Sequence, residues 1–449
     1  MLNRQYLWKS TFGSKIATTN IVLVANAIVW YVGILNVLQS TLGTVGEKSW
    51  LDPNSQTIIW GLHFAALIFS ALIGAKIAGR INRSRFLVLW MTLNAASSLT
   101  LFGLNYTNFI ITATLASLYG ISFGLGMPMC ISQYSDSLPV ENRGRTSGII
   151  MLISGMGMFA FAAAPLNFFE VGIVLSIWRT SSLIVFLAAG SSLKPELKKG
   201  TTSFRNVLSQ RSFLAYFVPW VLFSFVNFLV PLQPNVGGQP SDTILLIRYI
   251  FLGIFAVLGG FLLDFVGRKR IAITGFIMLG LSAAARGFIS ASTPSLFFSA
   301  IFEGTAWGLL LVLFILTLWG DLSDTLPSAK YYVIGVIPFF VSMFIGFTVG
   351  KQIEDTLPAT SLFPFAAFFL FIAVLPLFYS PETLPEKTMK DRELKSYLEK
   401  AQKFAHKEAE KTQQKEAKKN QKYQERSDEV KEENQEEYDK ARKLAEKYY

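Results

Sequence analysis

The stretch GGFLLDFVGRKR, from Gly259 to Arg270, joins two long apolar segments in the second half of this 449-residue chain. An apolar segment ends in a carboxylate, Asp264, and a glycine, Gly267, is followed directly by three cations. Glycine adopts left-handed backbone conformations without steric cost, so the chain can reverse direction here within a few residues. The pattern predicts a tight, charged turn between two antiparallel helices.

A weaker copy of this stretch, GAKIAGRINRSR, spans Gly74 to Arg85 in the first half. Aligned on its cations, it has Gly79 where the carboxylate is expected and Asn82 where the glycine is expected. Asparagine tolerates the left-handed region better than most other residues, so we expect a left-handed turn to survive at Asn82. Only the stretch in the second half carries the carboxylate, Asp264.

The composition is that of a membrane protein. The chain is 51% hydrophobic and only 16% charged, with a mean hydropathy of +0.41, and much of its charge lies from Glu386 onward. A soluble protein of this length rarely carries so few charges. A single cysteine, Cys130, and two histidines exclude an internal disulfide and a Cys/His metal cluster. No metal site or cofactor is predicted.

Apolar runs of roughly 20 residues, the length that spans a bilayer core, occur twelve times. The sequence therefore predicts an all-α polytopic membrane protein of twelve transmembrane helices, near residues 18–41, 55–79, 86–104, 108–131, 144–165, 172–191, 213–234, 243–264, 271–290, 295–319, 331–350 and 359–380. The Asn82-Arg83 and Gly267-Arg268 pairs are 185 residues apart, and Arg143 and Lys330 are 187 apart. This internal repeat predicts two pseudo-symmetric six-helix bundles. They are expected at residues 1–190 and 213–385, with a linker at 191–212 and a charged tail at 386–449.

The loop cations give the orientation. Most Lys and Arg residues of the predicted loops fall on one side of the membrane, and only Lys48 and Lys351 fall in loops on the other. By the positive-inside rule, both termini, the linker and the tail are expected in the cytoplasm, with the protein spanning the plasma membrane. The basic balance then reflects anionic lipid at the inner leaflet, and a nucleic-acid partner is not needed.

The two loop stretches resemble the motif that joins helices 2 and 3, and helices 8 and 9, in the major facilitator superfamily. A second resemblance is the acid and arginine, Asp136 and Arg143, that sugar porters of this superfamily carry between helices 4 and 5. Asp321, Asp324 and Lys330 stand at the equivalent place in the second half, and SPETLP (380–385) resembles a sugar-porter sequence after helix 12. The resemblance implies a solute transporter. Its cytoplasmic gate would comprise Asp136, Arg143, Gly260, Asp264, Gly267, Arg268, Lys269 and Lys330.

Charged residues inside the hydrocarbon layer are functional candidates by default. Four lie within predicted helices: Arg179, Arg248, Arg286 and Glu303. Arg286 and Glu303 are placed to pair between adjacent antiparallel helices as a structural contact, which would leave Arg248 free for an anionic or polar solute. A role for Glu303 in proton coupling is the other interpretation, and the residues leave both open.

Polar and aromatic side chains repeat at helical spacing on several predicted helices. This pattern suits either a solute pathway or hydrogen bonding between helices. The candidate pathway residues are Asn26, Trp30, Asn36, His63, Asn227, Arg248, Glu303 and Trp307.

Together these features predict a transporter that moves a small organic solute by alternating access: a polar metabolite, a sugar or an organic anion. Uniport and proton coupling are both open. The alternative is a transporter-like solute sensor that signals through its tail, which a deletion of residues 390–449 would test because a transporter keeps its flux without the tail. The tail itself is predicted as a solvated or disordered segment, or as a coiled coil that docks a partner. An enzyme is not expected, because the predicted helices carry no catalytic constellation.

Overall fold

The computed structural model describes residues 15–42, 52–78, 80–103, 108–164, 166–189, 202–229, 241–288, 293–323, 326–350, 353, 356, 359–384 and 386–448. Within these ranges, some side chains are not described, including that of the predicted pathway residue Asn227. The chain divides into two units, residues 1–384 and 385–449. We describe each unit by itself.

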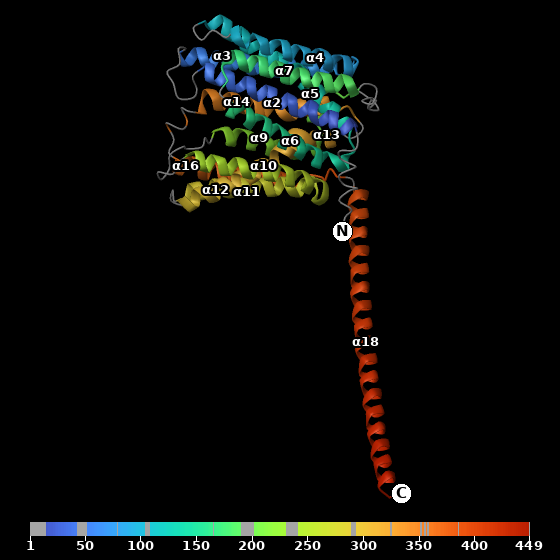
Figure 1. Cartoon of the computed structure of the whole chain (residues 1–449). Coiled ribbons are helices and arrows are strands. Elements are labelled where there is room, and N and C mark those ends of the chain that lie inside the picture. Colours follow the sequence, from blue (N-terminus) through green and yellow to red (C-terminus); the bar gives the residue numbers. More distant parts are fainter. Residues whose placement is uncertain are drawn as a thin grey trace. The chain divides into compact units, whose positions relative to one another are not determined.

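The first half of unit 1 contains six long helices that run parallel or antiparallel to one another (Figure 1). They are α2 (Lys15–Thr41), α3 (Pro53–Ile77), α4 (Arg83–Leu99), α5 (Phe109–Asp136), α6 (Val140–Ala163) and α7 (Phe168–Ala189). A 3₁₀ turn, η1 (Thr100–Gly103), extends α4.

The second half repeats this arrangement after a short helix, α8 (Phe204–Leu208). Its helices are α9 (Arg211–Leu229), α10 (Ser241–Val266), α11 (Arg268–Phe288), α12 (Thr293–Leu311), α14 (Ala329–Thr348) and α16 (Ala359–Ile372). The helix α12 continues through a π-helical segment, η3 (Val312–Thr317), into α13 (Leu318–Leu322), and α17 (Val374–Tyr379) follows α16.

Short polar residues cap the N-termini of three helices of the first half, α3, α4 and α5. The carboxylate of Asp52 accepts from the Ser55 backbone N–H (3.2 Å) ahead of Pro53 at the start of α3, and Asn108 accepts from the N–H of Ile111 at the start of α5. Asn82 accepts from the N–H of Arg85 (3.2 Å) and has φ −63° and ψ 111°. The expected left-handed turn at Asn82 is therefore wrong: the amide side chain caps the N-terminus of α4, and this requires an extended backbone.

The α10–α11 turn has the left-handed glycine that the sequence predicts, since Gly267 has φ +106°. The carboxylate of Glu382 accepts from the backbone N–H groups of Arg268 (2.8 Å) and Lys269 (3.2 Å) and so caps the N-terminus of α11. A side chain at position 267 would collide with this carboxylate. Glu382 belongs to the SPETLP segment, which gives that sequence a structural role in the turn.

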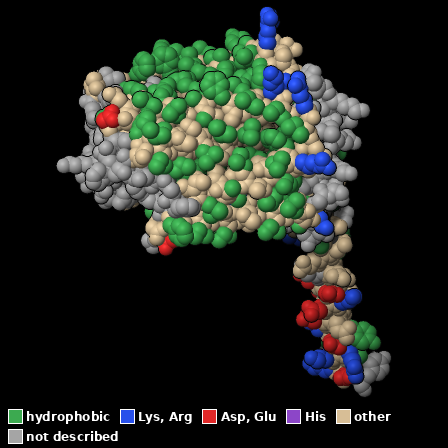
Figure 2. All heavy atoms as spheres, turned by 90° about the horizontal axis from the view of Figure 1, so that it is seen from above, with side chains coloured by type: hydrophobic (Ala, Val, Ile, Leu, Met, Phe, Trp, Pro, Cys, Tyr) green, Lys and Arg blue, Asp and Glu red, His purple; other side chains and the backbone are tan. Residues whose placement is uncertain are grey.

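Ten helical segments within the described ranges are long and apolar enough to cross a membrane. The helices α4 and α9 occupy the positions of the third and seventh predicted spans, and α9 is a shorter apolar helix. Large apolar side chains such as Phe69, Ile110, Phe159 and Phe365 are more than half exposed, and Figure 2 shows hydrophobic side chains spread over the face of the bundle. A soluble protein rarely exposes so large an apolar surface. The protein is an all-α, multi-pass membrane protein that contacts the lipid bilayer.

The two halves use the same helix pairings. The pair α3 and α5 in the first half corresponds to α10 and α12 in the second, and α4 with α7 corresponds to α11 with α16. Between the halves, α6 packs against α10 and α3 packs against α14. Five tryptophans are fully buried in this core: Trp30, Trp60, Trp90, Trp220 and Trp319.

We call the end of the bundle that carries Lys76, Arg85, Arg143, Arg268 and Lys330 the basic end. Lys and Arg side chains gather at one edge of the face shown in Figure 2. The other end of the bundle, where α3 begins at Pro53 and α10 begins at Ser241, is called the outer end.

Unit 2 is a single helix, α18 (Glu386–Tyr448), whose described side chains are exposed. They include apolar residues at positions 394, 397, 398 and 404. Whether a partner binds this helix stays a prediction.

Candidate functional site

A cavity of about 250 Å³ lies between the two halves of the bundle. The helices α2, α4, α5 and α6 of the first half and α12, η3 and α14 of the second contribute to its walls. Helices of both halves enclose it, so a movement of one half against the other changes its shape and its access. In membrane transporters built from two repeated halves, substrates bind between the halves near the midplane of the bilayer, so this cavity is the candidate solute site.

The cavity walls are apolar. The rings of Tyr31 and Phe123 stack with centroids 3.9 Å apart, and Phe340 of the second half meets Tyr31 edge-on at 6.1 Å. Further wall residues are Trp90, Phe339, Met127, Met151, Met158 and Met343. Aromatic rings favour flat or apolar solutes, and methionines adapt their shape to what they contact. The chain's single cysteine, Cys130, also lines the cavity.

Three of the predicted pathway residues make hydrogen bonds within the first half. The Asn26 amide donates to the Trp178 carbonyl (2.6 Å), and the Trp30 indole donates to the Ser98 hydroxyl (2.7 Å). His63 bonds through Nδ1 to the Ala116 carbonyl oxygen (2.8 Å). These contacts are of the interhelical kind that the sequence left as the alternative interpretation.

The remaining predicted pathway residues lie elsewhere. Asn36 is exposed, and Trp307 packs edge-on against Phe223 with centroids 5.0 Å apart. As far as the structure describes the cavity walls, they include none of the eight predicted pathway residues. The role of these residues in a solute pathway stays a prediction.

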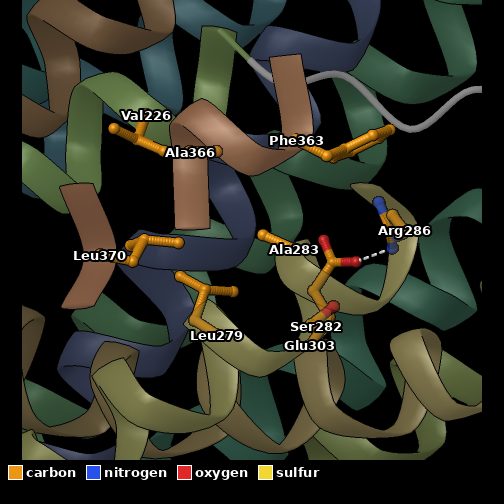
Figure 3. A pocket seen from close by; sticks show the side chains of 9 residues that line it. All are labelled: Val226, Leu279, Ser282, Ala283, Arg286, Glu303, Phe363, Ala366 and Leu370. Carbon is orange, nitrogen blue, oxygen red and sulfur yellow. Dashed lines mark hydrogen bonds and ion pairs between the residues drawn. The ribbon is translucent and has the colours of Figure 1, made fainter. Parts of the chain in front are cut away.

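Three of the four predicted intramembrane charges, on three different helices, form a cluster, and Figure 3 shows its Glu303–Arg286 pair. Glu303 of α12 pairs with Arg286 of α11 through one carboxylate oxygen and with Arg248 of α10 through the other (Nη1–Oε1 3.2 Å). Arg286 also donates to the Ser299 hydroxyl. Arg248 was expected to be free for a solute, but in the structure it shares the Glu303 carboxylate with Arg286. Each oxygen of this carboxylate contacts one of the two guanidinium groups. The cavity beside the cluster is about 30 Å³, roughly the space of one water molecule.

At the basic end, Asp264 joins the two halves. Its carboxylate accepts from the backbone N–H groups of Gly144 and Arg145 at the start of α6, each at 2.9 Å. It also lies 3.4 Å from the Arg145 Nε and 3.2 Å from the Arg268 Nη1. Asp264 is 1% exposed, so these charge-assisted contacts form away from water.

A second carboxylate, Asp321 of α13, also joins the halves. It accepts from Arg143 of α6 (Nη1–Oδ1 2.8 Å) and from Arg268 of α11 (Nε–Oδ2 2.8 Å). The sequence indicated Asp321 only as a counterpart of Asp136, and it was not among the predicted gate residues. The signal that pointed to it was its place between helices 10 and 11, with Lys330 nearby, where the second half repeats the acid and cation of Asp136 and Arg143.

The other predicted gate residues have different partners. Asp136 pairs with Arg83 of its own half (3.0 Å) and accepts from the Ser328 hydroxyl of the other half (3.0 Å). Lys330 donates to the Thr202 carbonyl, and Lys269 donates to the Phe378 carbonyl (2.7 Å). These residues hold the loops of the basic end together.

Glycines bring α6 and α10 into close contact near the basic end. A Cβ on Gly144 would lie 2.6 Å from the Gly260 carbonyl oxygen, and a Cβ on Gly148 would lie 2.7 Å from that of Ala256. Towards the outer end, no described atom lies within 4 Å of a Cβ placed on Gly155 of α6 or on Gly253 of α10. The two helices therefore touch at the basic end and separate towards the outer end. The structure is closed at the basic end.

No protein-family model matches the chain. Among curated proteins, the chain is similar to the niacin transporter NiaP of Acinetobacter baylyi, with 24% identity over 351 residues that cover 66% of this chain and 75% of the relative. Among solved structures, it resembles the crystal structure of the human organic anion transporter MFSD10 (TETRAN), with a TM-score of 0.58 and 13% identity, covering 81% of this chain and 99% of that one. The second likeness shows the fold.

The loop motifs, the repeated six-helix fold and the curated relative agree with one another. They exclude the soluble classes of protein and point to transport rather than enzyme chemistry. The chain is a multi-pass membrane protein whose loop motifs resemble those of the major facilitator superfamily, whose fold is that of the human transporter structure, and whose sequence is similar to that of a bacterial solute transporter.

Proposed function

We propose that the protein moves a small organic solute across the plasma membrane by alternating access, with the central cavity as its binding site. The observation that carries this proposal is the cavity itself, which is apolar and enclosed by helices of both halves. Its volume of about 250 Å³ suits a small molecule rather than a peptide or a lipid. The aromatic walls favour a solute with a flat or apolar body.

The charged contacts at the basic end act as the gate in this proposal. Asp264 and Asp321 each bind residues of both halves, so they hold that end closed while the cavity is reached from the outer end. Release on the other side requires these contacts to break and α6 and α10 to approach each other at the outer end. By the positive-inside rule, the basic end faces the cytoplasm.

The two similar proteins suggest which solutes to test first. The bacterial relative is named for niacin, and the human structure for organic anions. A panel of niacin, other aromatic and aliphatic carboxylates, sugars and neutral amides therefore covers both these solutes and the polar metabolites that the sequence leaves open. Coupling to protons is tested in the same assay by imposing a pH gradient.

The experiment measures uptake of each solute into proteoliposomes and stabilisation of the purified protein against heat. Ile315 lines the cavity, and the matched control, Ile277, is exposed on α11. We expect Ile315→Trp to fill the cavity and to remove both uptake and stabilisation, while Ile277→Trp retains them. A solute that stabilises Ile315→Trp as well as the wild type would place the binding site elsewhere.

A further inference from the structure

Arg179, in the middle of α7, is a cation that is fully buried in the first half of the bundle. Its Nη1 donates to the Asn26 side-chain oxygen (3.0 Å). Asn94, in the amide orientation that satisfies both its oxygen and its nitrogen, accepts from Nε (3.2 Å) and Nη2 (3.3 Å). The guanidinium carbon lies 4.2 Å from the centroid of the Trp90 ring. Two neutral amides and an aromatic ring thus hold a full positive charge.

This environment differs from that of the other buried arginines. The buried Arg143, Arg145 and Arg268 and the partly buried Arg248 and Arg286 each pair with a carboxylate. Among the described residues, no carboxylate forms an ion pair with Arg179. Each guanidinium nitrogen of Arg179 has a hydrogen-bond partner, but no described carboxylate neutralises the charge of the group. In a region of low dielectric constant, such a charge acts over several ångströms.

The charge of Arg179 lies close to the central cavity. Trp90 contacts the guanidinium and also lines the cavity, so the charge lies one side chain behind the wall. Cys130, on the same wall, is close enough to Arg179 for the two groups to interact electrostatically. The walls of the cavity are thus apolar, and a cation lies behind one of them.

We infer that Arg179 makes the transporter selective for organic anions, meaning solutes with an apolar or aromatic body and one carboxylate or similar charge. The apolar body contacts the aromatic and methionine walls, and the charge is attracted through Trp90 without contacting the arginine. This inference rests on the proposed function, because it takes the central cavity as the binding site. Arg179 acts here as a specificity determinant, not as a ligand.

The test compares each carboxylic acid with its own primary amide: niacin with nicotinamide, benzoate with benzamide, and octanoate with octanamide. The two members of each pair share a body and differ in charge at pH 7. Binding is measured on the purified full-length protein as the ratio of the dissociation constants of amide and acid. We expect the wild type to prefer the acid by about tenfold or more, because a buried positive charge attracts a carboxylate but not a neutral amide.

Substitutions then separate charge from structure. Arg179→Gln should bring the ratio close to one, and Arg179→Lys, which keeps the charge, should retain the preference for the acid. Lys76→Gln, which removes an exposed cation at the basic end, is the control and should change nothing. If Arg179 only fastens α7 to its neighbours, the Gln and Lys variants will lose stability together and the ratio will stay at its wild-type value.

A second pair of variants leaves Arg179 in place. Cys130→Asp puts a carboxylate on the cavity wall near the guanidinium and should abolish the acid preference, whereas Cys130→Asn should keep it. Equal ratios in these two variants would overturn the inference. A wild type that binds only neutral solutes would also overturn the inference, but the proposed function would stand. A wild type that binds no solute of either panel would overturn both.

Discussion

Replacing Asp264 with asparagine tests the gate directly. Asparagine has the same shape, but it carries no charge and one of its two side-chain heteroatoms is a donor. The two carboxylate oxygens of Asp264 each accept a hydrogen bond from one backbone N–H group of α6. The single amide oxygen of asparagine can replace only one of these two acceptors. The amide nitrogen then faces the other N–H. The substitution also removes the ion pair of Asp264 with the Arg145 guanidinium (3.4 Å), which joins the halves, whereas the contact with Arg268 lies within one half and does not oppose opening.

The magnitude follows from the contacts that break when the basic end opens. A hydrogen bond to a charged group contributes about 1.5–3 kcal/mol and a neutral one about 0.5–1.5 kcal/mol. Exchanging two charged bonds for one neutral bond thus weakens the closed state by about 1.5–5.5 kcal/mol. At about 1.36 kcal/mol per factor of ten, the ratio of closed to open protein falls by about 10-fold to 10,000-fold. The population should move towards the conformation that is open at the basic end.

Distances between spin labels across the basic end measure this shift. Arg85 on α4 and Arg270 on α11 are exposed, belong to different halves and can be labelled after substitution with cysteine in a Cys130→Ser background. Asp264→Asn should lengthen the main distance. The control is Arg83→Gln, which removes a charge that is paired with Asp136 within one half. An unchanged distance in Asp264→Asn, or an equal change in both variants, would show that Asp264 is not part of the gate.

Three further predictions use other parts of the bundle. Gly155→Leu fits the open space beside Gly155 on α6 but blocks the approach of α10. Solute binding should therefore persist while uptake falls by at least about tenfold, and an equal loss of both would contradict this. Glu303→Gln leaves two arginines without their shared carboxylate and should destabilise the protein by about 3 kcal/mol, measured by chemical denaturation, and an unchanged midpoint would refute the role of the cluster. Modification of Cys130 with N-ethylmaleimide should block uptake and bound solute should protect it, with Cys130→Ser as the insensitive control; inhibition of the Ser variant would place the reaction elsewhere.

The fold was predictable because its signals are local. Apolar runs of membrane-spanning length and loop cations on one side depend on residues that are close in sequence. The α10–α11 turn is a further example, since a left-handed backbone at Gly267 follows from the residue type alone. The prediction for Asn82 was wrong for a related reason. Asparagine is suited both to left-handed turns and to N-caps, and the sequence did not decide between them.

The candidate site was less predictable because its contacts join residues far apart in the chain. The predicted Asp136 and Arg143 do lie at the basic end, but each pairs with a different residue: Arg83 and Asp321. Polarity was also a poor guide to the cavity. Asn26 hydrogen bonds to Arg179 behind the wall, whereas apolar residues that resemble any other core, such as Met151, line the cavity. Residue type cannot separate a helix face that packs on a neighbour from one that faces a cavity.

The π-helical segment η3 links the cavity to the gate. Leu311, just before it, and Ile315, within it, line the cavity, and Asp321 follows four residues after its last residue, Thr317. The Thr317 hydroxyl bonds to Ser147 of the other half at 2.9 Å. A regular α-helix would move as a rigid rod, so pressure on its cavity face would displace the gate as a whole. π-helical turns inside α-helices occur frequently at functional sites. In the mechanism proposed above, a rearrangement of η3 would let the cavity-lining part of the helix move relative to Asp321 and so release the contacts at the basic end.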